Sequence, residues 1–247
     1  MNLDALPPFD RTALLLDMDG TLLDIAPTPD SVVVAPGLPE SLRTLSFHLQ
    51  GALAIVTGRP IETVDALLGD AVPAVAGEHG GVVRRAPNQT AERPELPFPP
   101  DAWLREAERL EAAWPGSLLE RKAHGFALHF RNAPEAEMPI HARLSALIAG
   151  SPEFWMPPAL MLWEIRPVGA DKARGVRVLM ERAPFAQRLP LFIGDDVTDE
   201  DGMRAARALG GAGLRVAPAF GDPAGVRAWL SHAARTGAWP PLPGARS

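Results

Sequence analysis

The chain contains no cysteine among its 247 residues. This absence excludes disulfide bonds, thiolate catalysis and metal sites built on cysteine. Long apolar runs are missing too, since none approaches the roughly 20 residues that a membrane-spanning helix needs. Residues 1–12 lack the basic segment and the apolar segment of a signal peptide. We therefore expect a cytoplasmic protein that inserts into no membrane.

An excess of positive charge is also absent. The 24 lysines and arginines are outnumbered by 30 aspartates and glutamates, which gives a net charge of −6. A mildly acidic protein is not generally attracted to nucleic acid or to anionic membranes, so we expect neither as a partner. The hydrophobic fraction of 47% and the charged fraction of 22% are ordinary for a soluble protein. The composition predicts no particular oligomeric state.

Two kinds of segment alternate near both ends of the chain. Apolar runs typical of strands buried on both faces of a parallel sheet occupy residues 12–17, 52–57, 189–195 and 213–217. Helix-like segments occupy residues 37–49, 59–69, 171–183 and 199–210. This alternation predicts an α/β fold with a doubly wound, Rossmann-like parallel sheet. The Pro- and Gly-rich segment from Trp239 onward is expected to be poorly ordered.

The middle of the chain has shorter elements. A proline-rich polar connector at 84–100 precedes them. Helices are predicted at 101–114 and 135–149, and short strands at 117–122, 126–131, 153–156 and 160–166. We therefore expect a core of residues 1–83 and 168–247, with residues 84–167 forming an inserted α+β domain.

Three carboxylates follow the first buried run, in "LLLDMDGTLLD" (14–24). Asp17 and Asp19 are two residues apart at the end of a strand, so their side chains face the same way. Ligands of doubly wound sheets bind at the carboxyl ends of strands, where this pair lies. Gly20 lets the chain turn away, so Asp24 is expected to be a loop or capping residue. The alternative for the pair itself is a strand-ending turn with a capping aspartate.

A second acidic group ends another buried run, in "LFIGDDVTDED" (191–201). The helix dipole favours acidic residues in the first turn of a helix, which accounts for Asp199. It does not account for Asp195 and Asp196 at the end of a strand. If Asp17, Asp19 and Asp195 converge, their repulsion requires a cation, and oxygen ligands beside a phosphate suit Mg²⁺.

Two further features are weaker by themselves. The stretch "AIVTGRP" (54–60) places the hydroxyl of Thr57 at a strand end, and Gly58 allows backbone N–H groups to approach an anion. Lys172, in "GADKARG" (169–175), can neutralise a phosphate beside a metal site. Taken singly, a capped turn and a surface lysine explain these features without any function. Together with the aspartates they suit phosphoryl transfer to an aspartate nucleophile.

In this order, "DMDGTLL", "TGR", Lys172 and "GDDVTDED" resemble the four motifs of the haloacid-dehalogenase-like phosphatases. The resemblance implies that Asp17 is the nucleophile and Asp19 the general acid and base. It implies that Thr57 holds the transferring phosphoryl group and that Lys172 steadies the negative charge.

The same resemblance implies a Mg²⁺ site. Its ligands would be Asp17, the backbone carbonyl of Asp19, and Asp195. Asp196 and Asp199 would support these ligands. Gly58 and Arg59, which follow the motif threonine, would contact the substrate.

Polar and apolar residues alternate in two predicted strands of the middle segment, "LLERK" (118–122) and "FALHFR" (126–131). If the strands pair as a hairpin, Lys122, His129 and Arg131 form one cationic surface. Glu164, in "LWEIRP" (162–167), can join it from a neighbouring strand. The alternative is an exposed sheet face with lysine–glutamate pairs.

These segments also resemble a narrower family, the trehalose-6-phosphate phosphatases, over most of the chain. The resemblance rests on "ERKAHGFALHFRNAP" (120–134), "AGEHGG" (76–81) and "WEIRP" (163–167). It implies that the middle domain is a cap that closes over the substrate. The substrate contacts that it implies are His79, Gly80, Lys122, His129, Arg131 and Glu164, with Glu78 near the cap junction. One departure is Ala173, where the family usually has glycine after the lysine.

The expected activity is Mg²⁺-dependent hydrolysis of trehalose 6-phosphate to trehalose and phosphate through an aspartyl-phosphate. One alternative is a phosphatase for another sugar phosphate, such as sucrose phosphate or mannosylglycerate phosphate. Another is a non-catalytic regulatory module that binds a sugar phosphate. A module of that kind would have lost catalytic groups, whereas Asp17, Asp19, Lys172 and Asp195 are all intact.

Overall fold

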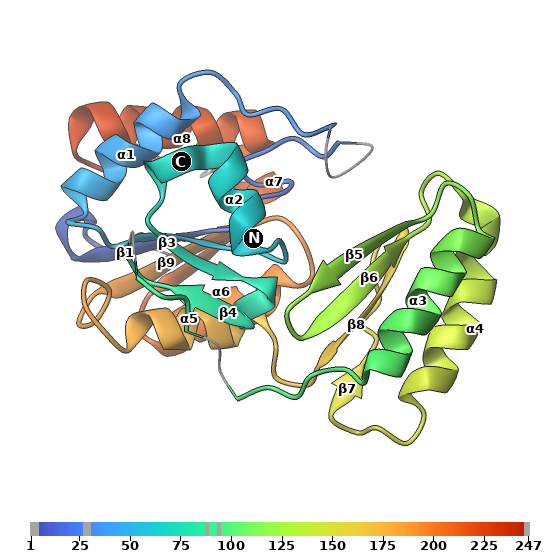
Figure 1. Cartoon of the computed structure of the whole chain (residues 1–247). Coiled ribbons are helices and arrows are strands. Elements are labelled where there is room, and N and C mark those ends of the chain that lie inside the picture. Colours follow the sequence, from blue (N-terminus) through green and yellow to red (C-terminus); the bar gives the residue numbers. More distant parts are fainter. Residues whose placement is uncertain (1–4, 27–30, 87–88, 93–94, 245–247) are drawn as a thin grey trace. The chain divides into compact units, whose positions relative to one another are not determined.

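The apolar runs expected to form a buried sheet do so in the computed structural model, which describes residues 5–26, 31–86, 89–92 and 95–244. Within these residues the sheet has six strands in the order β10-β9-β1-β2-β3-β4 (Figure 1). The strands are β1 (Thr12–Leu16), β2 (Leu53–Val56), β3 (Ala74–Gly77), β4 (Val82–Arg84), β9 (Leu189–Gly194) and β10 (Ala212–Arg215). All neighbours are parallel except β4, which runs antiparallel to β3.

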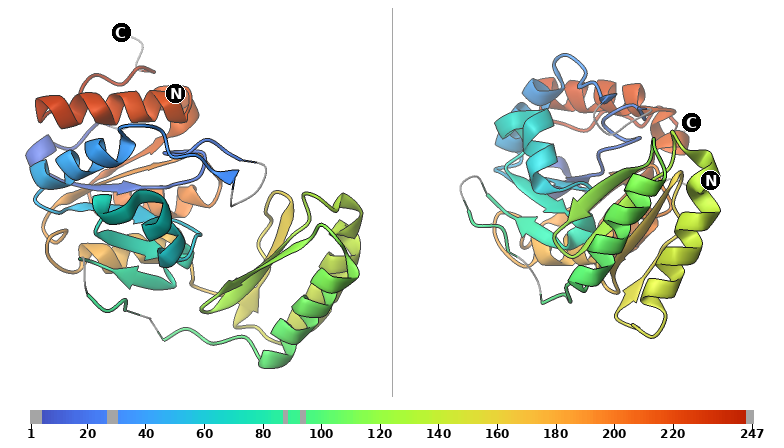
Figure 2. Two further views of the ribbon diagram at one scale, coloured as in Figure 1. Left: turned by 45° about the horizontal axis from the view of Figure 1, so that its top comes forward. Right: turned by 45° about the vertical axis from the view of Figure 1, so that its right-hand side comes forward.

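Helices cover both faces of this sheet. Figures 1 and 2 show α1 (Leu38–His48), α2 (Ile61–Leu68) and α8 (Pro223–Thr236) on one face. They show α5 (Lys172–Met180) and α6 (Asp199–Ala208) on the other. The short α7 (Val216–Phe220) follows β10. Because both faces are covered, every residue of β1, β2 and β3 is buried, and the prediction of a doubly wound α/β core is confirmed.

The segment after Trp239 is not poorly ordered as far as Gly244, so that expectation was wrong. The indole of Trp239 stacks on that of Trp229 at 4.8 Å between ring centroids. The indole N–H of Trp239 also donates to the carbonyl of Pro7 at 3.1 Å. The backbone N–H of Gly244 donates to the carbonyl of Ala219 at 2.9 Å. Aromatic packing therefore fixes a segment whose composition suggested disorder.

A second unit, Pro94–Ala170, separates from a first unit that joins Met1–Arg93 to Asp171–Ser247. The sequence placed the first boundary at residue 84. Backbone hydrogen bonds between Val83 and Glu92, at 2.9 and 2.7 Å, bring Glu92 back beside β4 in the first unit.

The second unit is an antiparallel sheet with two helices. Among its described residues the strand order is β5-β6-β8-β7. The strands are β5 (Leu118–Lys122), β6 (Gly125–His129), β7 (Phe154–Trp155) and β8 (Leu162–Pro167). Figure 1 shows α3 (Asp101–Ala113) and α4 (Glu137–Ile148) on one face of this sheet. Apolar side chains such as Phe126, Leu128 and Ile165 form a core with residues of these helices.

No helix in the described part of the chain is long and apolar enough to cross a membrane.

Candidate active site

Two neighbouring strands of the first unit bring aspartates together. β1 pairs with β9 in parallel, with Leu16 beside Ile193. Asp17 follows β1 directly, and its backbone N–H donates to the carbonyl of Ile193 at 2.9 Å. Asp195 follows β9 directly. Because parallel strands end at the same edge of a sheet, the two carboxylates meet there, as predicted.

A third carboxylate joins these two. Oxygen atoms of Asp17, Asp195 and Asp199 all lie within 4.8 Å of one another. Asp199 is fully buried at the start of α6. Its Oδ2 accepts hydrogen bonds from the backbone N–H groups of Asp195 and Asp196, at 3.1 and 2.9 Å. Asp199 therefore fixes the loop after β9 and also faces Asp17 and Asp195. We call Asp17, Asp195 and Asp199 the carboxylate cluster.

Two glycines leave room for the carboxylate cluster. A Cβ atom built on Gly20, whose φ is +75°, would lie 2.2 Å from Oδ2 of Asp195. A Cβ atom built on Gly194 would lie 2.3 Å from Cγ of Asp199. A side chain at either position would therefore displace a carboxylate of the cluster, and Gly20 also needs the left-handed conformation that glycine adopts without strain.

One ammonium group lies against the carboxylate cluster. Lys172, the first residue of α5, donates from Nζ to Oδ1 of Asp17 at 2.6 Å and to Oδ1 of Asp199 at 2.5 Å. The lysine and both carboxylates are buried. Three carboxylates against one ammonium leave two negative charges uncompensated. Lys172 thus lies beside Asp17, where a cation was expected. The part of Lys172 in a reaction stays a prediction.

The electrostatics of the cluster reflect this imbalance. Burial raises the pKa of the Asp17 carboxyl well above its usual value, and the Asp199 carboxylate adds to the rise. The pKa of Asp195 is raised by burial, then by Asp199 and Asp196. Burial acts to lower the pKa of Lys172, but Asp17 and Asp199 outweigh it, so the pKa is raised. A hard divalent cation fits this donor set, because carboxylate oxygens bind it and its charge would remove the repulsion.

Thr21 is a site residue that sequence reasoning missed. Its hydroxyl lies 3.2 Å from Oδ2 of Asp17 and 3.4 Å from Oδ1 of Asp195, and the residue is fully buried. It can donate to either carboxylate. The signal was present in "DGT", because a buried hydroxyl directly after a turn between acidic residues needs a partner.

Asp19 lies outside the carboxylate cluster. Its carboxylate forms a bidentate ion pair with Arg59, with Nε 2.6 Å from Oδ2 and Nη2 2.7 Å from Oδ1. Its side chain is 39% exposed, whereas that of Arg59 is 13% exposed. The structure thus gives Arg59 an acidic partner, a contact that the sequence did not predict.

The remaining predicted core residues lie at the ends of β2 and β3. The buried Thr57 follows β2, and its carbonyl accepts from the backbone N–H of His79 at 2.9 Å. A Cβ atom built on Gly58 would lie 2.5 Å from Nε2 of His79, so this glycine lets the imidazole pack on the backbone. Gly80 has a φ of +86° and packs against α5. A Cβ atom built on Gly80 would lie only 2.6 Å from the backbone N of Gly175. These contacts join the "TGR" and "EHG" segments.

Two more acidic residues, one in the last motif and one just after the first, lie apart from the carboxylate cluster. Asp196 is exposed, and its Oδ1 accepts from the backbone N–H of Val197 at 2.6 Å. Asp24 pairs with Arg227 of α8 at 3.2 Å, with its side chain 70% exposed. The exclusion of Asp24 from the site agrees with this pairing. A supporting role for Asp196 stays a prediction.

In the second unit, one face of the sheet is polar. The register of β5, β6 and β8 puts Glu120, Lys122, His129 and Glu164 on this face. The Nζ atom of Lys122 lies 2.6 Å from Glu164, both almost fully buried, and His129 lies 3.0 Å from Glu120. The face therefore carries a lysine–glutamate pair, as in the alternative prediction, but this pair is buried and not exposed. The single cationic surface of the first prediction is not formed, because Glu120 and Glu164 lie among its residues.

Two arginines differ from the prediction for this polar face. Arg131 lies beyond the end of β6 and is exposed, so it falls outside the strand alternation that placed it with Lys122. Arg166 was missed; it is buried, and its guanidinium lies 5.1 Å from the centre of the Trp155 ring. The alternation that placed Glu164 also places Arg166 on the same face.

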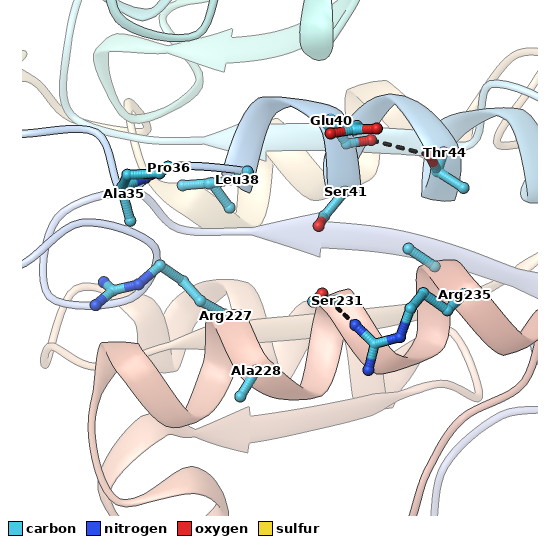
Figure 3. Close-up of a pocket in the computed structure, with 12 residues that line it drawn as sticks. Ala35, Pro36, Leu38, Glu40, Ser41, Thr44, Arg227, Ala228, Ser231 and Arg235 are labelled. Carbon is cyan, nitrogen blue, oxygen red and sulfur yellow. Dashed lines mark hydrogen bonds between the residues drawn. The ribbon is translucent and has the colours of Figure 1, made fainter.

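A groove of about 480 Å³ lies between α1 and α8. Figure 3 shows Ser41 and Ser231 pointing toward one another across it, with Arg235 donating to Ser231 at 2.8 Å. No residue of the carboxylate cluster lines it. The groove is thus separate from the candidate active site.

Comparisons with known proteins agree with the motifs. The family model described as trehalose-phosphatase matches residues 15–219, which include every residue of the carboxylate cluster. The chain belongs to the trehalose-phosphatase family.

Two curated relatives support this membership. A probable trehalose-phosphate phosphatase of Sinorhizobium fredii is 40% identical over 210 residues, covering 85% of this chain and 79% of the relative. A trehalose-6-phosphate phosphatase of Escherichia coli is 34% identical over 210 residues, covering 83% of this chain and 77% of the relative. The resemblance predicted from the sequence is therefore confirmed.

A solved structure of a family relative shares the fold. The C-terminal domain of a C. albicans trehalose-6-phosphate phosphatase superposes with a TM-score of 0.74 and covers 92% of each chain at 19% identity. The chain has only two lysines, Lys122 and Lys172. Each is buried and contacts a carboxylate, one in each unit.

Proposed function

We propose that the protein hydrolyses trehalose 6-phosphate to trehalose and inorganic phosphate. The observation that carries the proposal is the intact carboxylate cluster with Lys172 in a chain of the trehalose-phosphatase family. Relatives named for this activity support the choice of substrate.

In the proposed reaction, a carboxylate oxygen of Asp17 attacks phosphorus and the bond to the sugar oxygen breaks. Asp19 gives its proton to the departing sugar oxygen. The resulting aspartyl-phosphate is then hydrolysed by water, whose proton returns to Asp19. Thr57 would hold the phosphoryl group at the end of β2, together with Gly58. Lys172 would hold the attacking carboxylate in place.

The metal in this proposal is Mg²⁺. Asp17, the backbone carbonyl of Asp19, and Asp195 would hold it, with Asp196 in support. Asp199 would orient the loop that carries Asp195, since it accepts two backbone hydrogen bonds there. When bound, Mg²⁺ would offset the charge of the carboxylates and of the phosphate.

The second unit is proposed to act as the cap that selects the sugar. Lys122, His129, Arg131 and Glu164 would contact the sugar hydroxyls or the phosphate, and His79 and Gly80 would lie near the substrate in the first unit. Paired charges on the polar face support this, because alternating donors and acceptors suit a polyhydroxyl ligand.

The test is phosphate release from trehalose 6-phosphate, sucrose phosphate and mannosylglycerate phosphate in the presence of Mg²⁺. We expect trehalose 6-phosphate to have the highest kcat/KM. A higher value for either other ester would make that ester the substrate. No release from any ester would favour a regulatory binding module.

The variant Asp17→Asn tests the nucleophile. We expect it to lose at least about a thousandfold in kcat while its circular dichroism stays that of the wild type. Retained activity in this variant would rule out Asp17 as the nucleophile.

A further inference from the structure

Each of the two aspartates of the first motif contacts a different basic side chain. Lys172 and Thr21 contact Asp17, whereas the guanidinium of Arg59 contacts Asp19. The Arg59 contact uses two nitrogen atoms and both carboxylate oxygens, at 2.6 and 2.7 Å. Such a planar pair fixes the orientation of a carboxylate as well as its position. Asp19 is therefore oriented by a residue of the second motif.

The backbone of Arg59 is anchored on both sides. Its N–H donates to the hydroxyl oxygen of Thr57 at 3.2 Å, and its carbonyl accepts from the backbone N–H of Glu78 at 3.0 Å. A Cβ atom built on Gly77 would lie 2.9 Å from that carbonyl oxygen, so the chain passes very close there. The guanidinium therefore reaches Asp19 from a fixed point of the "TGR" segment.

The pair has one covered and one accessible end. The Arg59 side chain is 13% exposed and the Asp19 side chain 39% exposed, so the guanidinium is held in the fold while the carboxylate reaches solvent. Proton transfer depends strongly on where the acid lies relative to the accepting oxygen.

We infer that Arg59 is a positioning residue for Asp19, holding that carboxyl group where it can transfer a proton to the leaving sugar oxygen. The inference rests on the proposed function. In the first step the proton leaves Asp19 for the sugar oxygen as the P–O bond breaks and the bond from Asp17 to phosphorus forms. In the second step Asp19 takes the proton of the attacking water. The guanidinium bonds both oxygens of the carboxylate, so the hydrogen bond to one oxygen is released when that oxygen carries the proton. The hydrogen bond to the other oxygen then keeps Asp19 oriented.

The test compares two esters with different leaving groups. The sugar oxygen of trehalose 6-phosphate needs a proton to leave, whereas p-nitrophenolate leaves without one. The quantity to compare is kcat/KM, because it covers only the steps up to the departure of the leaving group. Arg59→Met is expected to lower kcat/KM for trehalose 6-phosphate at least about tenfold more than for p-nitrophenyl phosphate. Arg59→Lys should restore part of this ratio.

A double variant separates positioning from substrate binding. Asp19→Asn should show the same selective loss, and adding Arg59→Met to it should change the ratio of the two esters by less than about twofold. A further loss for trehalose 6-phosphate in the double variant would show that Arg59 binds the sugar, and would overturn the inference. Equal losses for both esters in Arg59→Met alone would overturn it as well.

The control is Arg43→Met, which removes an exposed arginine paired with Asp70 at 2.7 Å in the same unit. Both esters should be hydrolysed as by the wild type. Failure of the proposed function would appear separately, in the wild-type protein, as a lack of turnover of trehalose 6-phosphate. If the wild type is active while Arg59→Met keeps the wild-type ratio of kcat/KM for the two esters, only the inference about Arg59 fails.

Discussion

The Nζ atom of Lys172 lies 2.6 Å from Oδ1 of Asp17, although the two residues are 155 positions apart in the chain. The ammonium also contacts Asp199, and all three side chains are at most 5% exposed. A buried ion pair of this kind is costly to break, because the remaining charges keep their desolvation penalty without a partner.

Lys172→Met should therefore destabilise the first unit. We expect a loss of about 3–5 kcal/mol in the free energy of unfolding, since Asp17 and Asp199 remain buried without their ammonium. Added Mg²⁺ should return part of this loss. Denaturant unfolding followed by circular dichroism measures both effects. The exposed pair of Arg43 and Asp70 serves for comparison, and Arg43→Met should cost less than about 1 kcal/mol.

Mg²⁺ should stabilise the wild-type protein. At a concentration one hundred times its dissociation constant, a ligand of the native state contributes about 2.7 kcal/mol. Asp195→Asn removes one member of a repelling cluster, so it should not lower the melting temperature without metal, but it should abolish the rise with Mg²⁺. Asp201→Asn, whose partner is Arg204, should keep the rise. An unchanged rise in Asp195→Asn, measured by thermal unfolding, would place the ion elsewhere.

Two glycines with the same backbone conformation make a matched pair. Gly20 and Gly37 have φ values of +75° and +78°, but only Gly20 has atoms within 4 Å of a built Cβ, at 2.2 Å from Asp195. Gly37→Ala should cost roughly 1–2 kcal/mol of stability from backbone strain, with kcat unchanged. Gly20→Ala should cost more and should also lower kcat, because the methyl group displaces the Asp195 carboxylate. Equal kcat values in the two variants would contradict this.

The polar face of the second unit should make stability depend on pH. Burial acts to raise the pKa of Glu120, but Lys122 and His129 outweigh it, so the folded pKa lies below the ordinary value of 4.5. The stabilisation from this carboxylate is therefore present above about pH 4.5 and disappears as the pH falls through the lower folded pKa.

Glu120→Gln should therefore destabilise the second unit at neutral pH, and the difference from the wild type should shrink below pH 4.5. Hydrogen exchange of the amides of β5 and β6 measures the opening of this unit. Glu108→Gln, which removes the exposed partner of Arg121, should show only a small difference throughout. A difference for Glu120→Gln that is constant with pH would contradict the assignment.

Much of the core was predictable because its strands are buried on both faces. The runs that became β1 and β9 are continuous and apolar, so their ends, and hence the meeting of Asp17 and Asp195, followed from the rule for parallel strands. β3 (Ala74–Gly77) was missed because four small residues give little periodic signal. The helix α8 was also not predicted, although its sequence carried a signal. Val226, Trp229 and Leu230 share one buried face of this helix.

The side-chain pairs were less predictable than the strand ends. Nothing in the spacing of Asp19 and Arg59 indicates that they meet, because the direction of Asp19 depends on the turn at Gly20. In the second unit, the period of two placed Lys122 and Glu164 on one face. The same period fails for Arg131, because β6 ends at His129.

The burial of Lys122 and Lys172, the only lysines of the chain, has a consequence for chemical labelling. The rest of the 24 lysines and arginines are arginines, so an amine-reactive reagent finds no exposed lysine side chain on the folded protein. Either lysine can react only when its own unit opens locally. Acylation rates at the two positions, read by peptide mass spectrometry, therefore report the opening of the two units independently, with one natural probe in each.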